Sequence, residues 1–285
     1  MRTTTLSLVQ AEFFLAILLL VTVRTLLFKR VVNDIDPDAT SLCVGLGTVA
    51  SCVALWSVLA VLSRAPALHS DPGGIAAGVV KGTLLAVLMG MQQRLIGRSL
   101  SATTYTFPIA IGFIAVVESW AFGTRLAAGG IAAIAILFSA GVSFAMFGHL
   151  ASMQAADKRR FAWMIAIVVG FAICDKVGIP RIGWLPYLFW TGVGNVFAAW
   201  CVRRRLFGIR IRPLLFVGAI WALPELFFNF SLQTILPVAF GYLAIALRVP
   251  LLLGVSAVLY GEGKLREQLA FGAVAVVGVA LLFIG

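Results

Sequence analysis

Residues 237–283 read PVAFGYLAIALRVPLLLGVSAVLYGEGKLREQLAFGAVAVVGVALLF, and this stretch decides how the chain must fold. It holds two apolar runs, at 237–259 and 267–285, on either side of a short charged turn. An α-helix needs about 20 predominantly apolar residues to cross a bilayer, and each run is long enough. The stretch therefore predicts two membrane-spanning helices joined by a tight turn.

The same alternation of long apolar runs and short loops continues through the whole chain. Of its 285 residues, 61% are hydrophobic, and the mean hydropathy is +1.05. A soluble globular protein carries roughly 45–50% apolar residues. We therefore expect an all-α integral membrane protein with ten transmembrane helices. The predicted segments are 7–28, 40–63, 74–97, 101–122, 127–148, 160–178, 184–203, 212–234, 237–259 and 267–285.

The net charge of +11 comes mostly from short loops on one side of the predicted bundle, such as Lys158-Arg159-Arg160 and Arg203-Arg204-Arg205. The other side carries fewer basic residues, and we count Lys81 and Lys176 there. The positive-inside rule places the more basic loops in the cytoplasm, so both termini would lie outside a bacterial inner membrane. Charge arranged in this way suits contact with membrane lipids, and we expect no binding to nucleic acid.

Two parts of the chain align with each other. Residues 99–141 match 236–278 without gaps, and Tyr105 then falls on Tyr242. With five helices in each half, the second half must enter the membrane the opposite way up, as an inverted repeat. The predicted halves are 1–150 and 151–285. Such a pair of halves favours two conformations that open to opposite sides, which is alternating access.

The C-terminal stretch resembles the end of an EamA-type repeat of the drug/metabolite transporter (DMT) superfamily. The pattern consists of Pro250 within a helix, Gly261-Glu262 at the turn, and Gly272 and Gly278 in the last helix. AICDKVGIPR (172–181), followed by YLFW and RRR, resembles earlier helices of the same family. The resemblance implies a ten-helix transporter of small organic metabolites, with a central cavity between the halves.

The first half departs from that pattern at two aligned positions. Arg125 stands where the second half has Glu262, and Phe113 stands where it has Pro250. The Gly-Glu turn is therefore missing from the first half, although the helix count is unchanged. We expect segments 74–97, 101–122, 212–234 and 237–259 to line the cavity.

Arg248 is the leading candidate for a substrate or gating contact. It lies at the centre of an apolar run, where an arginine costs roughly 2.5 to 3.5 kcal/mol on insertion scales. Pro250 follows it and removes one backbone hydrogen bond from the helix. A guanidinium at that depth could bind a carboxylate or a phosphate, or form a permanent internal ion pair.

Glu225, in WALPELFFNF, is the natural partner of opposite charge. Trp221 and Asn229 lie one turn before and one turn after it on the same helix face. A buried carboxylate near Arg248 could exchange protons and couple transport to a proton gradient. The alternative is a structural partner of Arg248 that does not titrate.

Four further residues complete the candidate set: Tyr105, Tyr242, Gln92 and Glu118. Aromatic, amide and carboxylate side chains of this kind line polar cavities, but they also form interfacial belts and interhelical hydrogen bonds. Both readings stay open for each residue. The glycines of the later helices, among them Gly192, Gly194 and Gly272, are expected to allow close helix packing.

The sequence predicts no enzyme, no cofactor and no metal site. Its four cysteines and two histidines have no metal-ligand spacing. The predicted function is a secondary transporter, with export favoured, of a small polar or zwitterionic metabolite. Three alternatives remain: uptake of a similar solute, flipping of a lipid-linked substrate, and a membrane subunit that transports nothing.

Overall fold

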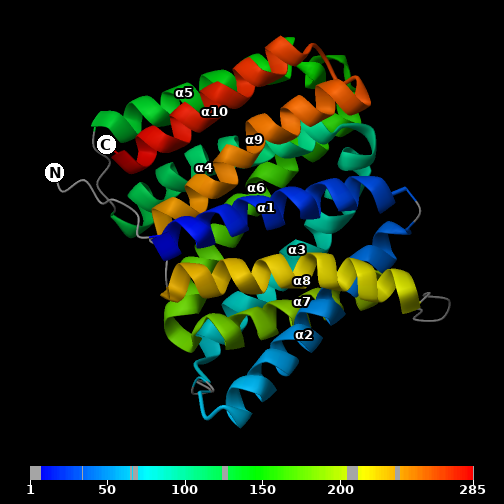
Figure 1. Ribbon diagram of the computed structural model, residues 1–285, viewed down its shortest axis with the longest axis vertical. Helices are drawn as coiled ribbons and strands as arrows, with labels where there is room; N and C mark the ends of the chain where they lie inside the picture. The colour runs from blue at the N-terminus through cyan, green and yellow to red at the C-terminus, as the bar shows by residue number, and fades with distance from the viewer. Residues whose placement is uncertain are drawn as a thin grey trace. The chain divides into compact units, whose positions relative to one another are not determined.

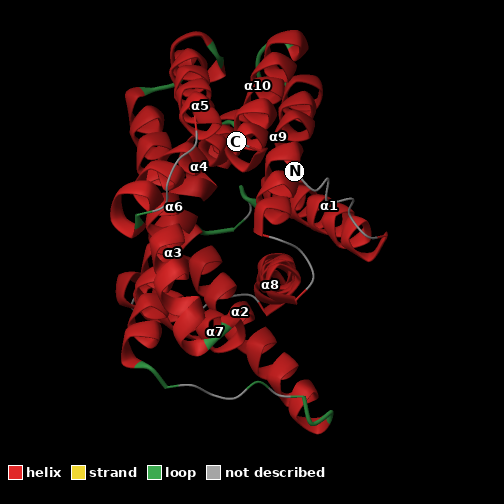
Figure 2. Cartoon of the chain, turned by 90° about the vertical axis from the view of Figure 1, so that its left-hand side faces the viewer, coloured by secondary structure: helices red, strands yellow, loops and turns green. Residues whose placement is uncertain are grey.

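The computed structural model describes residues 8–33, 35–64, 66, 70–123, 128–203, 211–234 and 238–284. These residues form ten α-helices and one short 3₁₀ helix, and no strand is found among them, as Figures 1 and 2 show. In chain order the helices are α1 (Leu8–Val31), α2 (Pro37–Val61), α3 (Pro72–Arg98), α4 (Leu100–Phe122), α5 (Ala128–Phe147), η1 (His149–Ser152), α6 (Ala155–Ile182), α7 (Trp184–Arg203), α8 (Ile211–Thr234), α9 (Val238–Tyr260) and α10 (Leu265–Ile284).

Seven of these helices, α1 to α7, are long and apolar enough to cross a membrane. This confirms the prediction of an all-α, multi-pass membrane protein. The ten helices coincide with the ten predicted segments. The largest shift is at α6, which begins at Ala155 rather than at 160. The charged residues Asp157 to Arg160 lie outside the apolar run. They are nevertheless helical, and lysine and arginine have high helix propensity.

The chain divides into two compact units, each made of separate stretches of sequence. Unit 1 is Met1–Thr25, Ser99–Gln154 and Phe227–Gly285, and unit 2 is Leu26–Arg98 and Ala155–Leu226. Unit 1 therefore contains α4, α5, η1, α9 and α10 with parts of α1 and α8. Unit 2 contains α2, α3, α6 and α7 with the remaining parts of α1 and α8. Each unit is described below by itself.

Unit 1 is built on an aromatic cluster from three helices. Tyr105 of α4 stacks on Phe144 of α5 at a centroid distance of 4.3 Å, and Phe271 of α10 meets both rings edge-on. Helix α4 contacts α5 and α9, and α10 contacts α9 and α5. The last two helices can approach closely at Gly272 because glycine has no Cβ. A Cβ there would come within 2.6 Å of the Cα of Pro250.

Unit 2 is held by close approaches between helix backbones. A Cβ on Gly82 of α3 would overlap the backbone of α7, at the carbonyl oxygen of Thr191 and at the nitrogen of Asn195. A Cβ on Gly194 of α7 would likewise overlap the backbone of α3 at Val79, and a Cβ on Gly192 would come within 3.1 Å of the backbone nitrogen of Val49 in α2. Small residues at helix crossings let backbones come together, which is how membrane helices gain van der Waals contact. The expected packing role of Gly192, Gly194 and Gly272 is thereby confirmed.

Candidate functional site

Arg248 lies in the middle of α9 and is 3% exposed. Its guanidinium carbon is 4.5 Å from the centroid of the Phe107 ring, on α4 of the same unit. A guanidinium over an aromatic face is attracted by the ring quadrupole, by about 2 kcal/mol or more where water is excluded. The structure therefore places this arginine in the interior of unit 1, with one face fixed by an aromatic ring.

Each of the two helices in this contact contains a proline close to it. Pro108 follows Phe107 in α4, and Pro250 follows Arg248 by two residues in α9. Each proline lacks the N–H that would bond the carbonyl four residues earlier, which belongs to Thr104 in α4. The hydroxyl of Thr104 is also buried and finds no hydrogen-bond partner among the described residues. Two proline-containing helices in contact thus supply a guanidinium and free polar atoms inside an apolar unit.

The other predicted site residues of unit 1 have different surroundings. Tyr105 is fully buried in the aromatic cluster, and its hydroxyl donates to the carbonyl of Phe271 at 3.3 Å. Asn229 is buried near the end of α8, and Glu118 is half-buried near the end of α4. Tyr242 lies on α9, but its side chain is outside the part of the structure that is described.

Glu225, Trp221 and Gln92 belong to unit 2. Trp221 is buried and meets Phe28 of α1 edge-on at 5.7 Å, while Glu225, one turn further along α8, is half-buried. Gln92 is buried on α3, and its side-chain oxygen accepts no hydrogen bond from the described residues. Since Glu225 and Arg248 fall in different units, the ion pair expected between them stays a prediction.

Unit 2 contains an ion pair that the sequence reading did not identify. Lys81 Nζ of α3 is 2.6 Å from Asp175 Oδ1 of α6, and the two side chains are 12% and 29% exposed. The ammonium group also lies 5.3 Å from the centroid of the Tyr187 ring and 5.8 Å from that of Phe171. At 1.5 Å per residue, Lys81 lies about 14 Å from the start of α3 and Asp175 about 10 Å from the end of α6. The pair is therefore well inside both helices.

Glu262 gives a structural meaning to the Gly-Glu turn between α9 and α10. Its carboxylate is 4% exposed and accepts hydrogen bonds from the backbone N–H of Leu100 at 2.8 Å and of Ser101 at 2.7 Å. The Ser99 hydroxyl lies 3.1 Å from the same group. The first N–H groups of a helix have no partner within the helix, and a carboxylate beside them also interacts favourably with the helix dipole. Glu262 thus caps α4.

The glycines on either side of Glu262 make this cap possible. Gly261 and Gly263 have φ of 66° and 83°, in the left-handed region that L side chains rarely adopt. The chain can therefore turn sharply before and after Glu262 while the carboxylate points at α4. This explains why Gly261 and Glu262 occur together in the turn.

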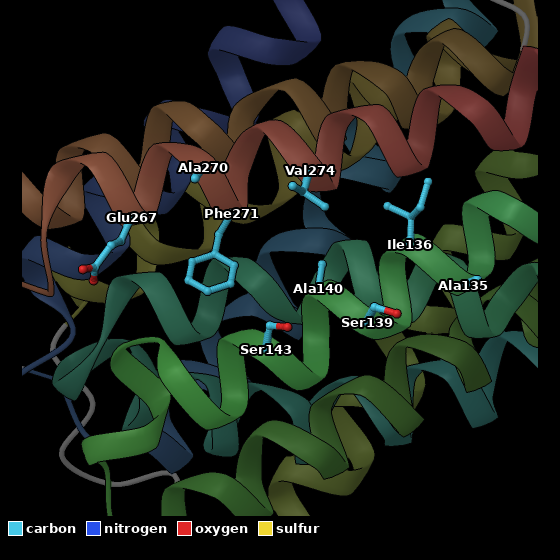
Figure 3. A pocket seen from close by; sticks show the side chains of 9 residues that line it. All are labelled: Ala135, Ile136, Ser139, Ala140, Ser143, Glu267, Ala270, Phe271 and Val274. Carbon is cyan, nitrogen blue, oxygen red and sulfur yellow. The ribbon is translucent and has the colours of Figure 1, made fainter.

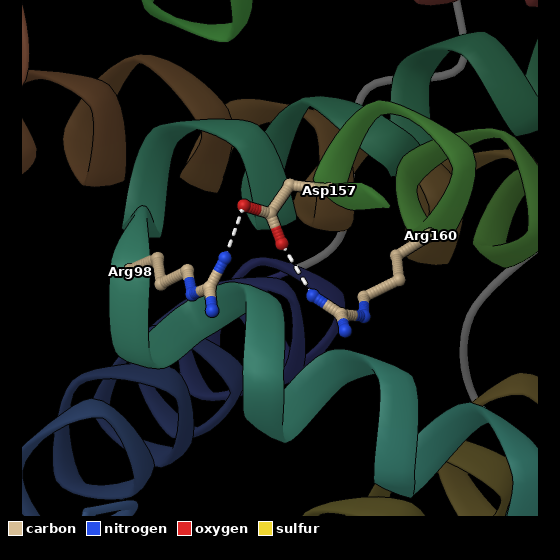
Figure 4. A network of polar contacts seen from close by, with 3 residues as sticks. All are labelled: Arg98, Asp157 and Arg160. Atoms are coloured by element: carbon tan, nitrogen blue, oxygen red, sulfur yellow. Dashed lines mark hydrogen bonds and ion pairs between the residues drawn. The ribbon is translucent and has the colours of Figure 1, made fainter. Parts of the chain in front are cut away.

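A second charged cluster lies where α3 ends and α6 begins. Asp157, 2% exposed, receives Arg98 on one carboxylate oxygen at 2.7 Å and Arg160 on the other at 2.5 Å, as Figure 4 shows. One carboxylate can neutralise only one of the two guanidiniums. Asp157 alone therefore does not neutralise this cluster.

Unit 1 also carries a mostly apolar groove of about 600 Å³ between α5 and α10. In Figure 3 the ring of Phe271 extends from α10 toward α5, and the polar groups along the groove include Ser139, Ser143 and Glu267. The lining offers two hydroxyls and a carboxylate but no positive charge that could bind an anionic group. The groove is a weaker candidate for a substrate site than the surroundings of Arg248.

No model of a known protein family matches the sequence, and no curated protein matches it either. The described residues hold no group of histidine, cysteine or acidic side chains that could bind a metal ion. A guanidinium such as that of Arg248 is a group suited to bind a carboxylate or a phosphate.

Proposed function

We propose that this protein is a secondary transporter of the drug/metabolite type, which moves a small polar or zwitterionic organic metabolite across the bacterial inner membrane. The observation that carries the proposal is Arg248, buried at the centre of α9 against Phe107. Ionisable residues within apolar helices mark substrate or ion pathways in membrane proteins. Helices interrupted at mid-length form the binding sites of many secondary transporters.

In this proposal all ten helices cross the membrane as two inverted repeats of five. Helices α9 and α10 have 23 and 20 residues, which is sufficient for a span. The contacts within unit 1 support the repeat. If α4 corresponds to α9 and α5 to α10, then the contact of α4 with α5 has its counterpart in the contact of α9 with α10. The resemblance of the C-terminal stretch to EamA-type transporters agrees with this arrangement.

Arg248 would bind the anionic group of the substrate with two parallel hydrogen bonds. A planar guanidinium suits a carboxylate or a phosphate in this way, and Phe107 would hold its plane in position. Glu225 would be the proton-sensitive group, exchanging between a pair with Arg248 and a protonated form when substrate occupies the arginine. Transport would then consume a proton gradient.

A thermal-shift screen of the purified protein in detergent tests the proposal. It would cover amino acids, amines, nucleotides, sugars and phosphorylated metabolites. A ligand at 100 times its dissociation constant should stabilise the protein by about 2.7 kcal/mol. We expect the shift to vanish in Arg248→Ala, to shrink in Arg248→Lys, and to persist in Arg266→Ala, which changes an exposed arginine of the same unit.

Each other outcome has a definite meaning. A ligand shift that survives Arg248→Ala would show that the arginine is structural. The absence of any hit at millimolar concentrations would favour a lipid-linked substrate or a subunit that transports nothing. For a confirmed ligand, counterflow in vesicles of defined orientation separates export from uptake, and Glu225→Gln should abolish the response to a pH gradient.

A further inference from the structure

Unit 2 contains a groove of about 300 Å³ at the end where α3 finishes and α6 begins. Two arginines line it, Arg94 of α3 and Arg160 of α6, together with Ser41 of α2. The other lining residues are apolar or glycine, from α3 and α7: Ala86, Val87, Gly90, Met91, Ala198, Ala199 and Val202. Charge and apolar surface therefore meet in one groove.

The two kinds of surface are separated along the groove. Arg94 stands near the end of α3 and Arg160 near the start of α6, so both guanidiniums belong to the mouth. From Arg94 the lining follows α3 back to Ala86, which is about 12 Å at 1.5 Å per residue. The groove thus runs from a cationic mouth about two helical turns into the apolar part of the unit.

Asp157 does not by itself cancel the positive charge at the mouth. Asp157 is shared between Arg98 and Arg160, and one carboxylate cannot neutralise both. Arg94 is exposed and makes no ion pair with the described residues. An anion at the mouth would therefore meet a clear excess of positive charge.

The groove leaves open space beside Gly90 of α3. A Cβ on this residue would meet no atom within 4 Å. Eight residues earlier on the same helix, a Cβ on Gly82 would overlap the backbone of α7. Helix α3 therefore packs against α7 at Gly82 but leaves space at Gly90, two turns further along.

We infer that this groove binds the phosphate headgroup of an anionic phospholipid, with the start of an acyl chain lying along α3. Basic pockets between transmembrane helices recognise such headgroups on the cytoplasmic side. The positive-inside rule assigns this end of the unit to the cytoplasmic leaflet. The commitment to a lipid rests on the apolar run below the arginines, because a free phosphate would use the mouth alone.

Native mass spectrometry of the delipidated full-length protein tests the inference. Phosphatidylglycerol and phosphatidylcholine with identical acyl chains would be added in parallel. The wild type should retain phosphatidylglycerol in preference. One guanidinium near the membrane surface contributes about a fivefold difference, so Arg94→Gln should lower retention by about that factor. Arg159→Gln, the matched change at an exposed arginine that does not line the groove, should leave retention unchanged.

Gly90→Leu distinguishes a lipid from a free anion. The leucine fills open space, so both guanidiniums stay in place while the path of the acyl chain is blocked. We expect this variant to lose phosphatidylglycerol and to melt at the temperature of the wild type or above it. Equal retention of the two lipids, or equal retention by wild type and Arg94→Gln, would overturn the inference. So would a thermal shift with inorganic phosphate that Gly90→Leu leaves intact and Arg94→Gln removes, because the ligand would then be a free anion.

Discussion

Each of the two units holds a cation near the middle of an apolar helix, Lys81 in unit 2 and Arg248 in unit 1, and these two cations have different surroundings. Lys81 of unit 2 is matched by the carboxylate of Asp175 at 2.6 Å and by two aromatic rings. Arg248 of unit 1 lies on the face of Phe107, and a proline follows each of these two residues in its helix. Lys81 has an opposite charge beside it on a neighbouring helix of its own unit, whereas Arg248 lies beside two helix positions that lack a backbone N–H.

The difference suggests a division of labour. Unit 2 combines backbone-to-backbone helix crossings with a locally neutralised charge, which favours a rigid scaffold. Unit 1 combines proline-containing helices with a buried guanidinium, which favours ligand binding and conformational change. Variants of the Lys81–Asp175 pair and of the helix crossings in unit 2 should therefore change stability without changing affinity for the transported ligand. Variants around Arg248 should change that affinity more than they change stability.

Asp175→Asn should have the largest effect on stability. Removing one partner of a buried ion pair leaves the other charge uncompensated, which costs about 3 to 5 kcal/mol. Because the Asp175 side chain is 29% exposed, we expect the free energy of unfolding to fall by an amount near the lower limit of that range. Thermal unfolding in detergent would measure it.

The double variant Lys81→Met/Asp175→Leu is the control for this prediction. It removes both charges and should recover most of the loss, since apolar residues of similar size can replace a buried pair. If Asp175→Asn unfolded like the wild type but lost ligand binding, the pair would belong to the binding site and the comparison of the two units would fail.

Gly82→Ala should come next, with a loss of about 2 kcal/mol. The added Cβ would overlap the backbone of α7, and overpacking of this kind typically costs 1 to 3 kcal/mol. Gly90→Ala provides a matched control on the same helix, because a methyl group there meets nothing. It should be neutral or slightly stabilising, given the higher helix propensity of alanine. Equal melting temperatures for the two variants would argue against the close α3–α7 crossing.

Glu262→Gln should cost about 1.5 kcal/mol, the lower end of the range for a hydrogen bond to a charged group. Glutamine keeps one acceptor but turns an N–H₂ group toward the donors of α4. The matched control is Glu267→Gln on α10, whose ion pair with Lys264 is exposed and contributes about 0 to 1 kcal/mol. If the two variants were equally stable, the cap would have no energetic role. Denaturant unfolding of both variants decides between these outcomes.

How far the sequence could predict this structure depends on the range of the interaction concerned. The ten helices follow from local hydropathy, because each apolar run is about as long as a bilayer is thick. Arg248 was identified for a similarly local reason, since it is a lone charge at the centre of such a run. Glu262 was noticed only as part of a turn motif. Its partners Leu100 and Ser101 lie on α4, about 160 residues earlier in the sequence, and no local pattern reveals such a contact.

The Lys81–Asp175 pair was missed for a related reason. Each residue lies about 10 to 14 Å from a helix end, where a long side chain can still reach the interface. The segment around Lys81, taken alone, therefore predicts an ammonium group at the membrane surface. Only the contact of α3 with α6 shows that the ammonium group faces a carboxylate inside the helix bundle of unit 2.

Phe107→Leu should have a modest effect on stability and still separate the two units most clearly. It removes a buried cation–π contact but keeps an apolar side chain, so the free energy of unfolding should fall by about 1 to 2 kcal/mol. Phe113→Leu, an exposed site on the same helix, is the matched control. Because the ring fixes the plane of the guanidinium, Phe107→Leu should weaken ligand-induced stabilisation several-fold, whereas Phe113→Leu should leave it intact. The same weakening in both variants would mean that α4 matters to the ligand only as a packed helix, and the special role assigned to the surroundings of Arg248 would be lost.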